Sequence, residues 1–271
     1  MQQYFSGNVL YGDDFTPQEI EDWYKDEKEG YAGLIKSDPR AYHYGYHQVN
    51  NLHLFKFLPK KKFLNVLGLG SAYGHEFLPV APLIENLYIL EPSDALVNED
   101  LPKNIHVIYK KPSTGGEMDF PDDFFDLVVC FDTLHHIPNV SQVFSEMARC
   151  LNPTGHLLVK EPVTSMGDWR LERPGLTKRE RGIPYFYFER LIQKTGLITL
   201  HRSLFFTMTS FLTRKLQKML PKAIYEYHAY LLADKFLSRL LEWHICYHPR
   251  NWWQRIAPSQ VGYVLTKSSD G

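Results

Sequence analysis

The segment 63–91 places the strongest constraint on how this chain can fold. It holds an apolar run at 63–67, glycines at 68, 70 and 74, and a second apolar run at 87–90 that ends at Glu91. Short apolar runs of this kind are typical of buried parallel strands. Glycines let backbone N–H groups approach a ligand, and an acid after the second strand can accept hydrogen bonds from both ribose hydroxyls. The segment therefore predicts a nucleoside site, with a helix over 75–84 between the two strands.

The spacing of the glycines distinguishes between two classes of nucleoside cofactor. A dinucleotide site requires Gly-x-Gly-x-x-Gly, and Tyr73 stands where the third glycine would be. The spacing Gly68-x-Gly70-x-x-x-Gly74 resembles instead the first motif of class I S-adenosylmethionine-dependent methyltransferases. Relative to that motif, Gly68 replaces an acid that helps to hold the amino group of the cofactor, and Ala72 replaces the middle glycine. For this loop taken alone, a glycine-rich turn without a ligand is the alternative.

Three further motifs follow in the order and spacing of the same family. A predicted strand contains Phe-Asp-Leu at 125–127, a turn reads Leu134-His135-His136-Ile137, and a helix ends in Arg-x-Leu-x-Pro-x-Gly at 149–155. Residues 63–162 are therefore similar to a class I methyltransferase core of the type 11 kind.

The resemblance and the alternation of strands and helices predict an α/β fold. We expect a doubly wound, seven-stranded, mostly parallel sheet of the Rossmann-like methyltransferase type. Besides the two strands above, strands are expected at 105–109, 125–130, 156–160, 197–206 and 261–266, and helices at 140–151 and 186–194. The last strand is expected to run antiparallel between the strands at 156–160 and 197–206.

We expect four parts along the chain. They are an N-terminal helical lid at 1–60, a cofactor-binding core at 61–206 with an acceptor loop at 163–184, a helical insertion at 207–258, and the last strand and tail at 259–271. In the lid, Thr16 has the pattern of an N-cap for a helix that ends at Gly30, and 43–57 predicts a second helix. Lid residues that are candidates to line the cleft are Tyr11, Asp13, Asp14, Tyr42, Tyr44, Tyr46 and His47.

The resemblance implies S-adenosylmethionine as the cofactor and assigns residues to it. Those expected around its methionine portion are Gly68, Gly70, Ser71, Gly74, Phe131 and Asp132. Glu91 is expected on the ribose. Ser113 and Thr114 are expected near adenine, at a place where the family often carries an acid.

Methyl transfer to a hydroxyl needs a positioned acceptor and benefits from a nearby base. His136, in preference to His135, is the candidate base, and Glu161 and Asp168 are further acid–base candidates at the carboxyl ends of strands. The alternative is that both histidines bind backbone groups and shape their turn. No set of Cys, His or acidic residues has metal-ligand spacing, so the sequence predicts no obligatory metal.

The loop after the strand at 156–160 is rich in arginine and turn-forming residues. Expected acceptor contacts are Tyr11, Asp14, Trp169, Arg170 and Arg173, because a tryptophan can stack on a sugar and arginines bind hydroxyl, carboxylate or phosphate groups. The run resembles a segment of methyltransferases that accompany cell-surface glycan assembly, which implies O-methylation of a sugar or glycan intermediate. A quinone, lipid or other small metabolite is the alternative acceptor, and a non-catalytic partner protein is the alternative role.

Charge and composition narrow the partners of the chain. The net charge of −1 over 271 residues and the absence of a recognition motif argue against nucleic-acid binding. Three scattered cysteines, no visible signal peptide and no long apolar run predict a cytoplasmic protein. Residues 201–257 carry nine bases against three acids, and apolar residues recur there at helical spacing, including Leu231, Leu232, Phe236 and Leu240. Core packing is the preferred interpretation of this stripe, and peripheral contact of 207–258 with a membrane or partner is the alternative.

Overall fold

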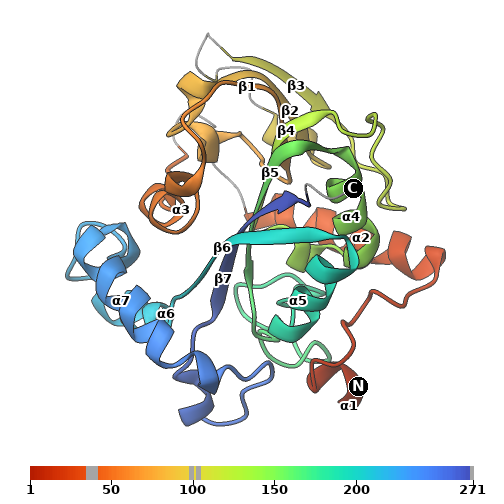
Figure 1. The fold of residues 1–271 in the computed structure, drawn as a ribbon. Coiled ribbons are helices and arrows are strands. Elements are labelled where there is room, and N and C mark those ends of the chain that lie inside the picture. The colour runs from red at the N-terminus through yellow and green to blue at the C-terminus, as the bar shows by residue number, and fades with distance from the viewer. Residues whose placement is uncertain (35–41, 98–100, 102–104, 269–271) are drawn as a thin grey trace.

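The computed structural model describes residues 1–34, 42–97, 101 and 105–268, with side chains at all of these except 28–34. Its centre is one sheet, with strands β1 (Phe63–Leu69), β2 (Ile84–Leu90), β3 (His106–Lys110), β4 (Phe125–Phe131), β5 (Leu151–Pro162), β6 (Leu197–Phe205) and β7 (Gln260–Lys267). The strand order is β3-β2-β1-β4-β5-β7-β6, and β7 runs antiparallel to both of its neighbours (Figure 1). The predicted fold class and the predicted place of the last strand are confirmed.

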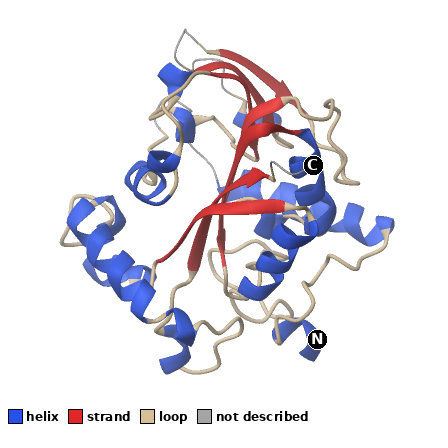
Figure 2. Cartoon of the chain, in the orientation of Figure 1, coloured by secondary structure: helices blue, strands red, loops and turns tan. Residues whose placement is uncertain are grey.

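Helices cover both faces of the sheet, as Figure 2 shows. They are α1 (Gln2–Phe5), α2 (Pro17–Leu34), α3 (His47–His53), α4 (Val140–Cys150), α5 (Tyr185–Lys194), α6 (Thr209–Leu216) and α7 (His228–Leu240). Alternate residues of each central strand point to opposite faces. Val128 and Cys130 therefore join a core under α4 and α5, whereas Leu127 and Val129 join a second core on the other face.

The helix predicted over 75–84 is wrong. The chain forms two short 3₁₀ turns there, His75–Phe77 and Ala81–Leu83. Pro79 and Pro82 prevent a continuous helix, because proline lacks the N–H group and clashes with the preceding turn. No α-helix terminus therefore faces the glycine turn in this described stretch.

The bounds of three other elements differ from those predicted from the sequence. The N-cap is confirmed, because the hydroxyl of Thr16 accepts the backbone N–H of Glu19 (3.4 Å) and the carboxylate of Glu19 accepts the backbone N–H of Thr16 (2.9 Å). However, α2 continues past Gly30 to Leu34. The helix predicted over 43–57 is the shorter α3 followed by a 3₁₀ turn. Strand β5 begins at Leu151 and includes the predicted turn, with a register shift opposite Phe125 and Leu127.

The apolar stripe of the helical insertion is mostly not core. Leu231 is buried, but Leu232, Phe236 and Leu240 are 49%, 67% and 55% exposed. The preferred interpretation of this stripe is therefore wrong for these three positions. None of the helices in the described part of the chain is long and apolar enough to cross a membrane.

Candidate active site

Two cavities meet at the carboxyl ends of β1, β2 and β4. The first lies against Glu91, Pro92, Ser93 and Pro112, and the second is walled by Tyr42, Tyr44, Tyr46, Glu76 and Gln260. Both cavities are lined by Gly70, Asp132 and His136. This edge is where an open parallel sheet places its ligand crevice.

Glu91 is fixed at the end of β2 in the first cavity. It is only 3% exposed, and its two carboxylate oxygens accept the backbone N–H groups of Ala72 (3.2 Å) and Ser93 (2.9 Å). Burial raises the pKa of Glu91, while these two hydrogen bonds oppose the rise. A carboxylate has lone pairs beyond the two used here, so a ribose diol fits as a further donor pair.

In the glycine turn, the backbone at Gly70 packs closely against the side chain of Thr133. Gly70 has a φ of +63°, and a Cβ there would lie 2.7 Å from the hydroxyl oxygen of Thr133. Only glycine combines this left-handed conformation with that contact. Ala72, which stands where the family has a glycine, also has a positive φ, +45°.

At position 68, glycine is required by the packing of neighbouring side chains. A Cβ at this position would meet the Ser71 hydroxyl and lie 2.9 Å from the ring of Phe77. An acid therefore does not fit at position 68. Instead, the buried carboxyl of Glu76 reaches the second cavity, which Ser71 also lines, and burial is the main cause that raises the pKa of Glu76 to about 7. No local sequence pattern marks Glu76, and the only indirect signal for it is the absence of an acid at position 68.

Asp132 supplies a buried acceptor at the junction of the two cavities. Its Oδ2 pairs with Lys160 (2.7 Å), whereas Oδ1 is buried with no hydrogen-bond partner among the described residues. A buried oxygen of this kind is costly unless a ligand donates to it. This unpartnered atom and the close-packed turn at Gly70 fit a bound cofactor.

Two residues expected near adenine lie elsewhere. Ser113 donates to Glu117 (2.8 Å), the carbonyl of Thr114 accepts from Asn139 (3.2 Å), and both residues are exposed. Neither lines the two cavities. The first cavity is bounded there by Pro92, Ser93 and Pro112, which the sequence analysis did not select.

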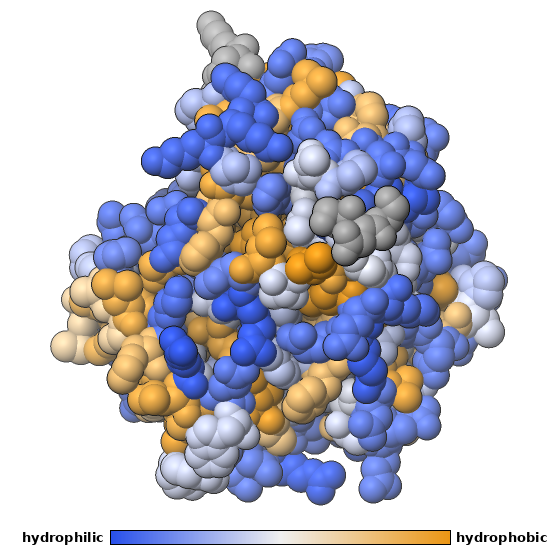
Figure 3. Space-filling view, in the orientation of Figure 1, coloured by the Kyte–Doolittle hydropathy of each residue, from blue (hydrophilic) through white to orange (hydrophobic). Residues whose placement is uncertain are grey.

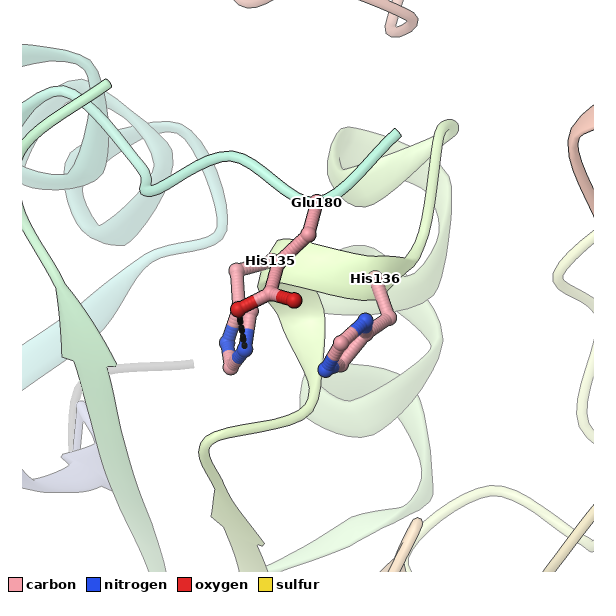
Figure 4. Close-up of side chains that lie close together, drawn as sticks. All are labelled: His135, His136 and Glu180. Atoms are coloured by element: carbon pink, nitrogen blue, oxygen red, sulfur yellow. Dashed lines mark ion pairs between the residues drawn. The ribbon is translucent and has the colours of Figure 1, made fainter. Parts of the chain in front are cut away.

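The Leu-His-His turn follows β4, and its two histidines have different surroundings (Figure 4). His135 is buried, with Nδ1 2.7 Å from Glu161 and Nε2 3.6 Å from Glu180. Burial is the largest single influence and lowers the pKa of His135, but the charge and hydrogen bond of Glu161, together with the charges of Glu180 and Asp132, outweigh it and the pKa is raised. This favours the protonated ring, which cannot act as a base.

Glu161 organises this turn from the end of β5. Its carboxylate accepts the backbone N–H groups of Thr133 (2.8 Å), Leu134 (2.7 Å) and His135 (3.3 Å) as well as the His135 ring. Glu161 is fully buried and does not line the two cavities. Its contacts are those of a positioning residue rather than of a catalytic acid.

His136 is half-buried and lines both cavities. Its Nδ1 lies 2.8 Å from Oε2 of Glu27, which α2 brings from 109 residues away. Glu27 also accepts the hydroxyl of Thr177 (2.6 Å) and the backbone N–H of Arg179 (2.9 Å). Burial acts to raise the pKa of Glu27, but these contacts, led by the hydrogen bond to His136, lower it overall. Glu27 is thus an ionised partner that orients the His136 ring.

Arg181 joins the loop at 163–184 to the histidine turn. It is fully buried and donates to the carbonyls of Tyr11, Leu134, His135, Ile137 and Pro138, at 2.8–3.3 Å. The carbonyls of Leu134, His135 and Pro138 also accept backbone N–H groups, so Arg181 adds a second donor at these three positions. The position of both histidine rings therefore depends on this loop.

The residues expected to contact the acceptor are mostly used in packing. Trp169 is 8% exposed and stacks on Tyr11, with ring centroids 4.9 Å apart. Arg173 donates to four backbone carbonyls, those of Met166, Thr177, Lys178 and Glu180. Because Trp169 and Arg173 are used in this way, they are corrected from ligand contacts to scaffold residues of the loop.

The remaining candidates lie at the surface. Asp14 is exposed and accepts the hydroxyl of Tyr4 (2.9 Å). Asp168 pairs with Arg170 (2.9 Å), and hydrogen bonds from Arg170 lower the pKa of Asp168 to about 2. A carboxylate held so far below neutral pH is a poor base. None of these residues lines either cavity.

One group in the described part of the chain has donor atoms close enough to suggest a metal. Atoms of His135, His136 and Glu180 lie within 4.8 Å of one another, and Figure 4 shows the three side chains directed toward a common region. In the structure His135 and Glu180 form an ion pair with each other. The expectation that no metal is required stays a prediction.

Comparison with known proteins places this geometry in a family. The family model described as a methyltransferase domain matches residues 43–201. An uncharacterized methyltransferase of Bacillus subtilis, YcgJ, is 27% identical over 101 residues, which span 35% of this chain and 39% of the relative.

Solved structures share the fold. A putative S-adenosylmethionine-dependent methyltransferase from Listeria monocytogenes has a TM-score of 0.55 at 12% identity, covering 83% of this chain and 98% of that one. A SAM-dependent methyltransferase from Leishmania major has a TM-score of 0.55 at 12% identity, covering 97% and 89%. The family model, which matches more than half of the chain, and the shared sheet topology agree. The chain belongs to the methyltransferase domain family, in the class I fold that uses S-adenosylmethionine as its cofactor.

Proposed function

We propose that the protein is an S-adenosylmethionine-dependent O-methyltransferase whose acceptor is a sugar or glycan-biosynthesis intermediate. One observation carries the proposal: two cavities meet at Gly70, Asp132 and His136. The first cavity contains Glu91, an acid suited to bind ribose hydroxyls, and the second is lined by tyrosines and other polar residues. A methyl donor in one cavity and a hydroxyl in the other would react at the junction.

The residues of the first cavity, together with those of the second cavity next to the junction, account for cofactor binding. When bound, S-adenosylmethionine supplies an electrophilic methyl group on a sulfonium. Glu91 would hold the ribose hydroxyls, with Gly70, Ser71 and Gly74 shaping the turn. Glu76 and Oδ1 of Asp132 would accept the cofactor's amino group, in place of the acid that cannot fit at position 68.

His136 would act as the base for the acceptor. The proton of the acceptor hydroxyl passes to Nε2 of His136, and Glu27 at Nδ1 stabilises the resulting positive charge. This arrangement repeats the general pattern of a base that is oriented by a third group. His135, which is paired with Glu161 and Glu180, would fix the turn rather than take the proton.

The second cavity favours a hydroxylated acceptor. It has a volume of about 330 Å³, within the range of small-molecule sites. Its lining includes Tyr42, Tyr44 and Tyr46, and Oε1 of Gln260 is a buried acceptor with no partner among the described residues. Polar groups of this kind discriminate for hydroxyl groups more strongly than an apolar pocket does. A quinone or lipid is the alternative acceptor class.

The decisive experiment compares His136→Asn with the wild type on a panel of sugar, glycan-intermediate and quinone acceptors. We expect turnover to fall roughly 10²–10⁴-fold while calorimetric affinity for S-adenosylmethionine is unchanged. His106→Asn, an exposed histidine at the start of β3, is the matched control.

Two results would argue against the proposal. Full turnover by His136→Asn would remove His136 as the base. A wild type that binds neither S-adenosylmethionine nor S-adenosylhomocysteine would favour the non-catalytic partner role.

A further inference from the structure

Helix α7 has its apolar side outward. Leu232, Phe236 and Leu240 lie four residues apart, so they share one helix face, and each is about half or more exposed. The inward face holds Leu231, but also the polar Asp234 and Ser238, which are 3% and 0% exposed. An ordinary surface helix has the reverse arrangement.

The inward polar groups fix this orientation. Asp234 accepts the backbone N–H groups of Phe206 (2.6 Å) and Thr207 (3.0 Å) at the end of β6, and Ser238 bonds the hydroxyl of Thr207 (2.7 Å). Rotation of α7 to bury its leucines would leave these backbone donors and the Asp234 carboxylate without partners, at a high cost. The outward apolar face is therefore a stable feature of the fold.

A group of exposed tryptophans follows in the chain beyond the end of α7. Trp243, Trp252 and Trp253 are 75%, 72% and 54% exposed. His244 lies between them, with ring centroids 5.1 Å from Trp243 and 5.2 Å from Trp253, and Trp252 contacts Trp253. We call these three tryptophans and Leu232, Phe236 and Leu240 the outer apolar surface.

The insertion that carries this surface is rich in exposed bases, and some of them are its sequence neighbours: Arg239 precedes Leu240, and Arg250 and Arg255 flank Trp252 and Trp253. The exposed bases of the insertion are Arg214, Lys215, Lys218, Lys222, Arg239, Arg250 and Arg255. Its three acids are engaged within the protein: Asp234 as above, Glu226 with His43 (3.0 Å) and Glu242 with Arg202 (2.7 Å). Figure 3 shows hydrophobic surface at the left, where Figure 1 places α6 and α7, next to hydrophilic residues.

We propose that the outer apolar surface docks on an anionic lipid bilayer. Exposed tryptophans beside apolar side chains suit the boundary between lipid headgroups and acyl chains. The exposed bases of the insertion, whose own three acids are engaged within the protein, suit a negatively charged leaflet, to which each base adds attraction. A protein partner would meet the same apolar residues, but the combination of tryptophans and exposed bases favours lipid.

The insertion also contacts the wall of the second cavity. Tyr225 stacks on Tyr46, with ring centroids 4.9 Å apart, and Glu226 pairs with His43. Docking would hold this wall close to the bilayer, which favours an acceptor carried by the membrane, such as a lipid-linked sugar. That extension rests on the proposed function, whereas lipid binding does not.

Tryptophan fluorescence provides a direct test. Of the five tryptophans, Trp23 and Trp169 are 0% and 8% exposed, so a change in emission on docking reports on the other three. The full chain is titrated with phosphatidylcholine vesicles, with and without phosphatidylglycerol, and binding is confirmed by flotation. We expect a blue shift and flotation with anionic vesicles, both weakened by salt.

Substitutions then locate the contact. Phe236→Ser is expected to weaken vesicle binding about tenfold, and Arg239→Gln about fivefold. Phe186→Ser on α5 is the matched control, because Phe186 is 72% exposed on another part of the molecule. Circular dichroism and melting temperature verify that each variant is folded.

Three results would overturn the proposal. The first is no binding of the wild type to anionic vesicles at low salt. The second is equal loss of binding in Phe236→Ser and Phe186→Ser. The third is a dimer that Phe236→Ser dissociates, in a protein that does not bind vesicles, which would assign the surface to a second copy of the chain. Cofactor titration is measured separately, so a failure here is distinguishable from a failure of the proposed methyltransferase.

Discussion

The two sides of the proposed active site are built in different ways. Most of the cofactor side comes from one continuous stretch, 63–93, which is joined by the segment after β4, by Pro112, and by Tyr24 and Glu27 of α2. Backbone hydrogen bonds hold it, such as Gly70 N–H to the carbonyl of Leu90 (2.9 Å) and Glu91 N–H to the carbonyl of Lys110 (3.1 Å). The acceptor side combines residues from α2, the segment before α3, the histidine turn, the loop at 163–184 and the start of β7.

This difference separates rigid from adaptable parts of the site. Strand register fixes the cofactor side, so its geometry is insensitive to most side-chain changes. The acceptor side depends on side-chain hydrogen bonds between distant segments, such as Glu27 to His136 and Arg181 to the histidine turn. Acceptor specificity can therefore change by substitution while the cofactor side stays intact.

The largest effect is expected from removing the arginine that joins the acceptor side. Arg181→Met removes the buried guanidinium that donates to five backbone carbonyls and should lower the free energy of unfolding by about 3–5 kcal/mol. Chemical denaturation measures this change, with Arg170→Met, at an exposed position, as the control. If the two sides are independent, the folded variant keeps its cofactor affinity. Loss of cofactor binding in proportion to stability would refute that independence.

A substitution on the cofactor side should instead weaken cofactor binding and leave stability largely unchanged. Glu91→Ala removes the predicted acceptor for the ribose hydroxyls and should weaken S-adenosylmethionine binding about 100-fold. Calorimetric titration provides the measurement. Glu85→Ala, an exposed acid on the same strand, is the control. Unchanged affinity in Glu91→Ala would exclude the assigned ribose contact.

Substitution of Glu76 tests whether this residue takes the role of the acid that is missing at position 68. The raised pKa, about 7, means that the folded protein holds a proton that the unfolded chain releases near its ordinary pKa of 4.5. Unfolding free energy should therefore fall as pH rises from about 5 to about 7, and Glu76→Gln should remove this slope.

Cofactor affinity provides the second measurement on Glu76. If the ionised carboxylate binds the cofactor's amino group, affinity rises over the same pH range in the wild type. Glu76→Gln should bind about tenfold more weakly at pH 8 and show no such rise. A pH-independent affinity in the wild type would exclude this role.

A smaller effect is expected at Ala72 in the glycine turn. Its φ of +45° is unfavourable for a residue with a Cβ, so Ala72→Gly should raise the free energy of unfolding by about 1 kcal/mol. Thermal and chemical denaturation measure the gain. A loss of stability would mean that neighbouring packing, rather than backbone conformation, decides the preference at this position.

The smallest effect is expected from metal removal. Treatment with a chelator should leave turnover and melting temperature unchanged, because His135 and Glu180 already pair with each other. Metal analysis of the purified protein accompanies the measurement. Loss of activity that is restored by a divalent cation would instead make His135, His136 and Glu180 a metal site.

Local sequence patterns determined the sheet and much of the cofactor side. Apolar runs predicted the strands that form it, because a parallel strand buried on both faces needs apolar residues along its length. The glycine spacing and Glu91 were also recognisable in the sequence, because backbone conformation and the position of a strand end are local properties. The prediction of a helix over 75–84 was wrong because Pro79 and Pro82 prevent a continuous helix despite the surrounding pattern.

Only the tertiary structure decided which polar groups meet. The Glu27–His136 contact joins residues 109 positions apart, and no local pattern specifies such a pair. The same holds for Trp169 and Arg173, whose residue types suit ligand binding but which the fold uses in packing. In α7 the helical spacing was correct, yet the anchoring of Asp234 to β6 determined which face is turned to solvent. Periodicity defines a helix face, but only the neighbouring elements determine whether that face is buried.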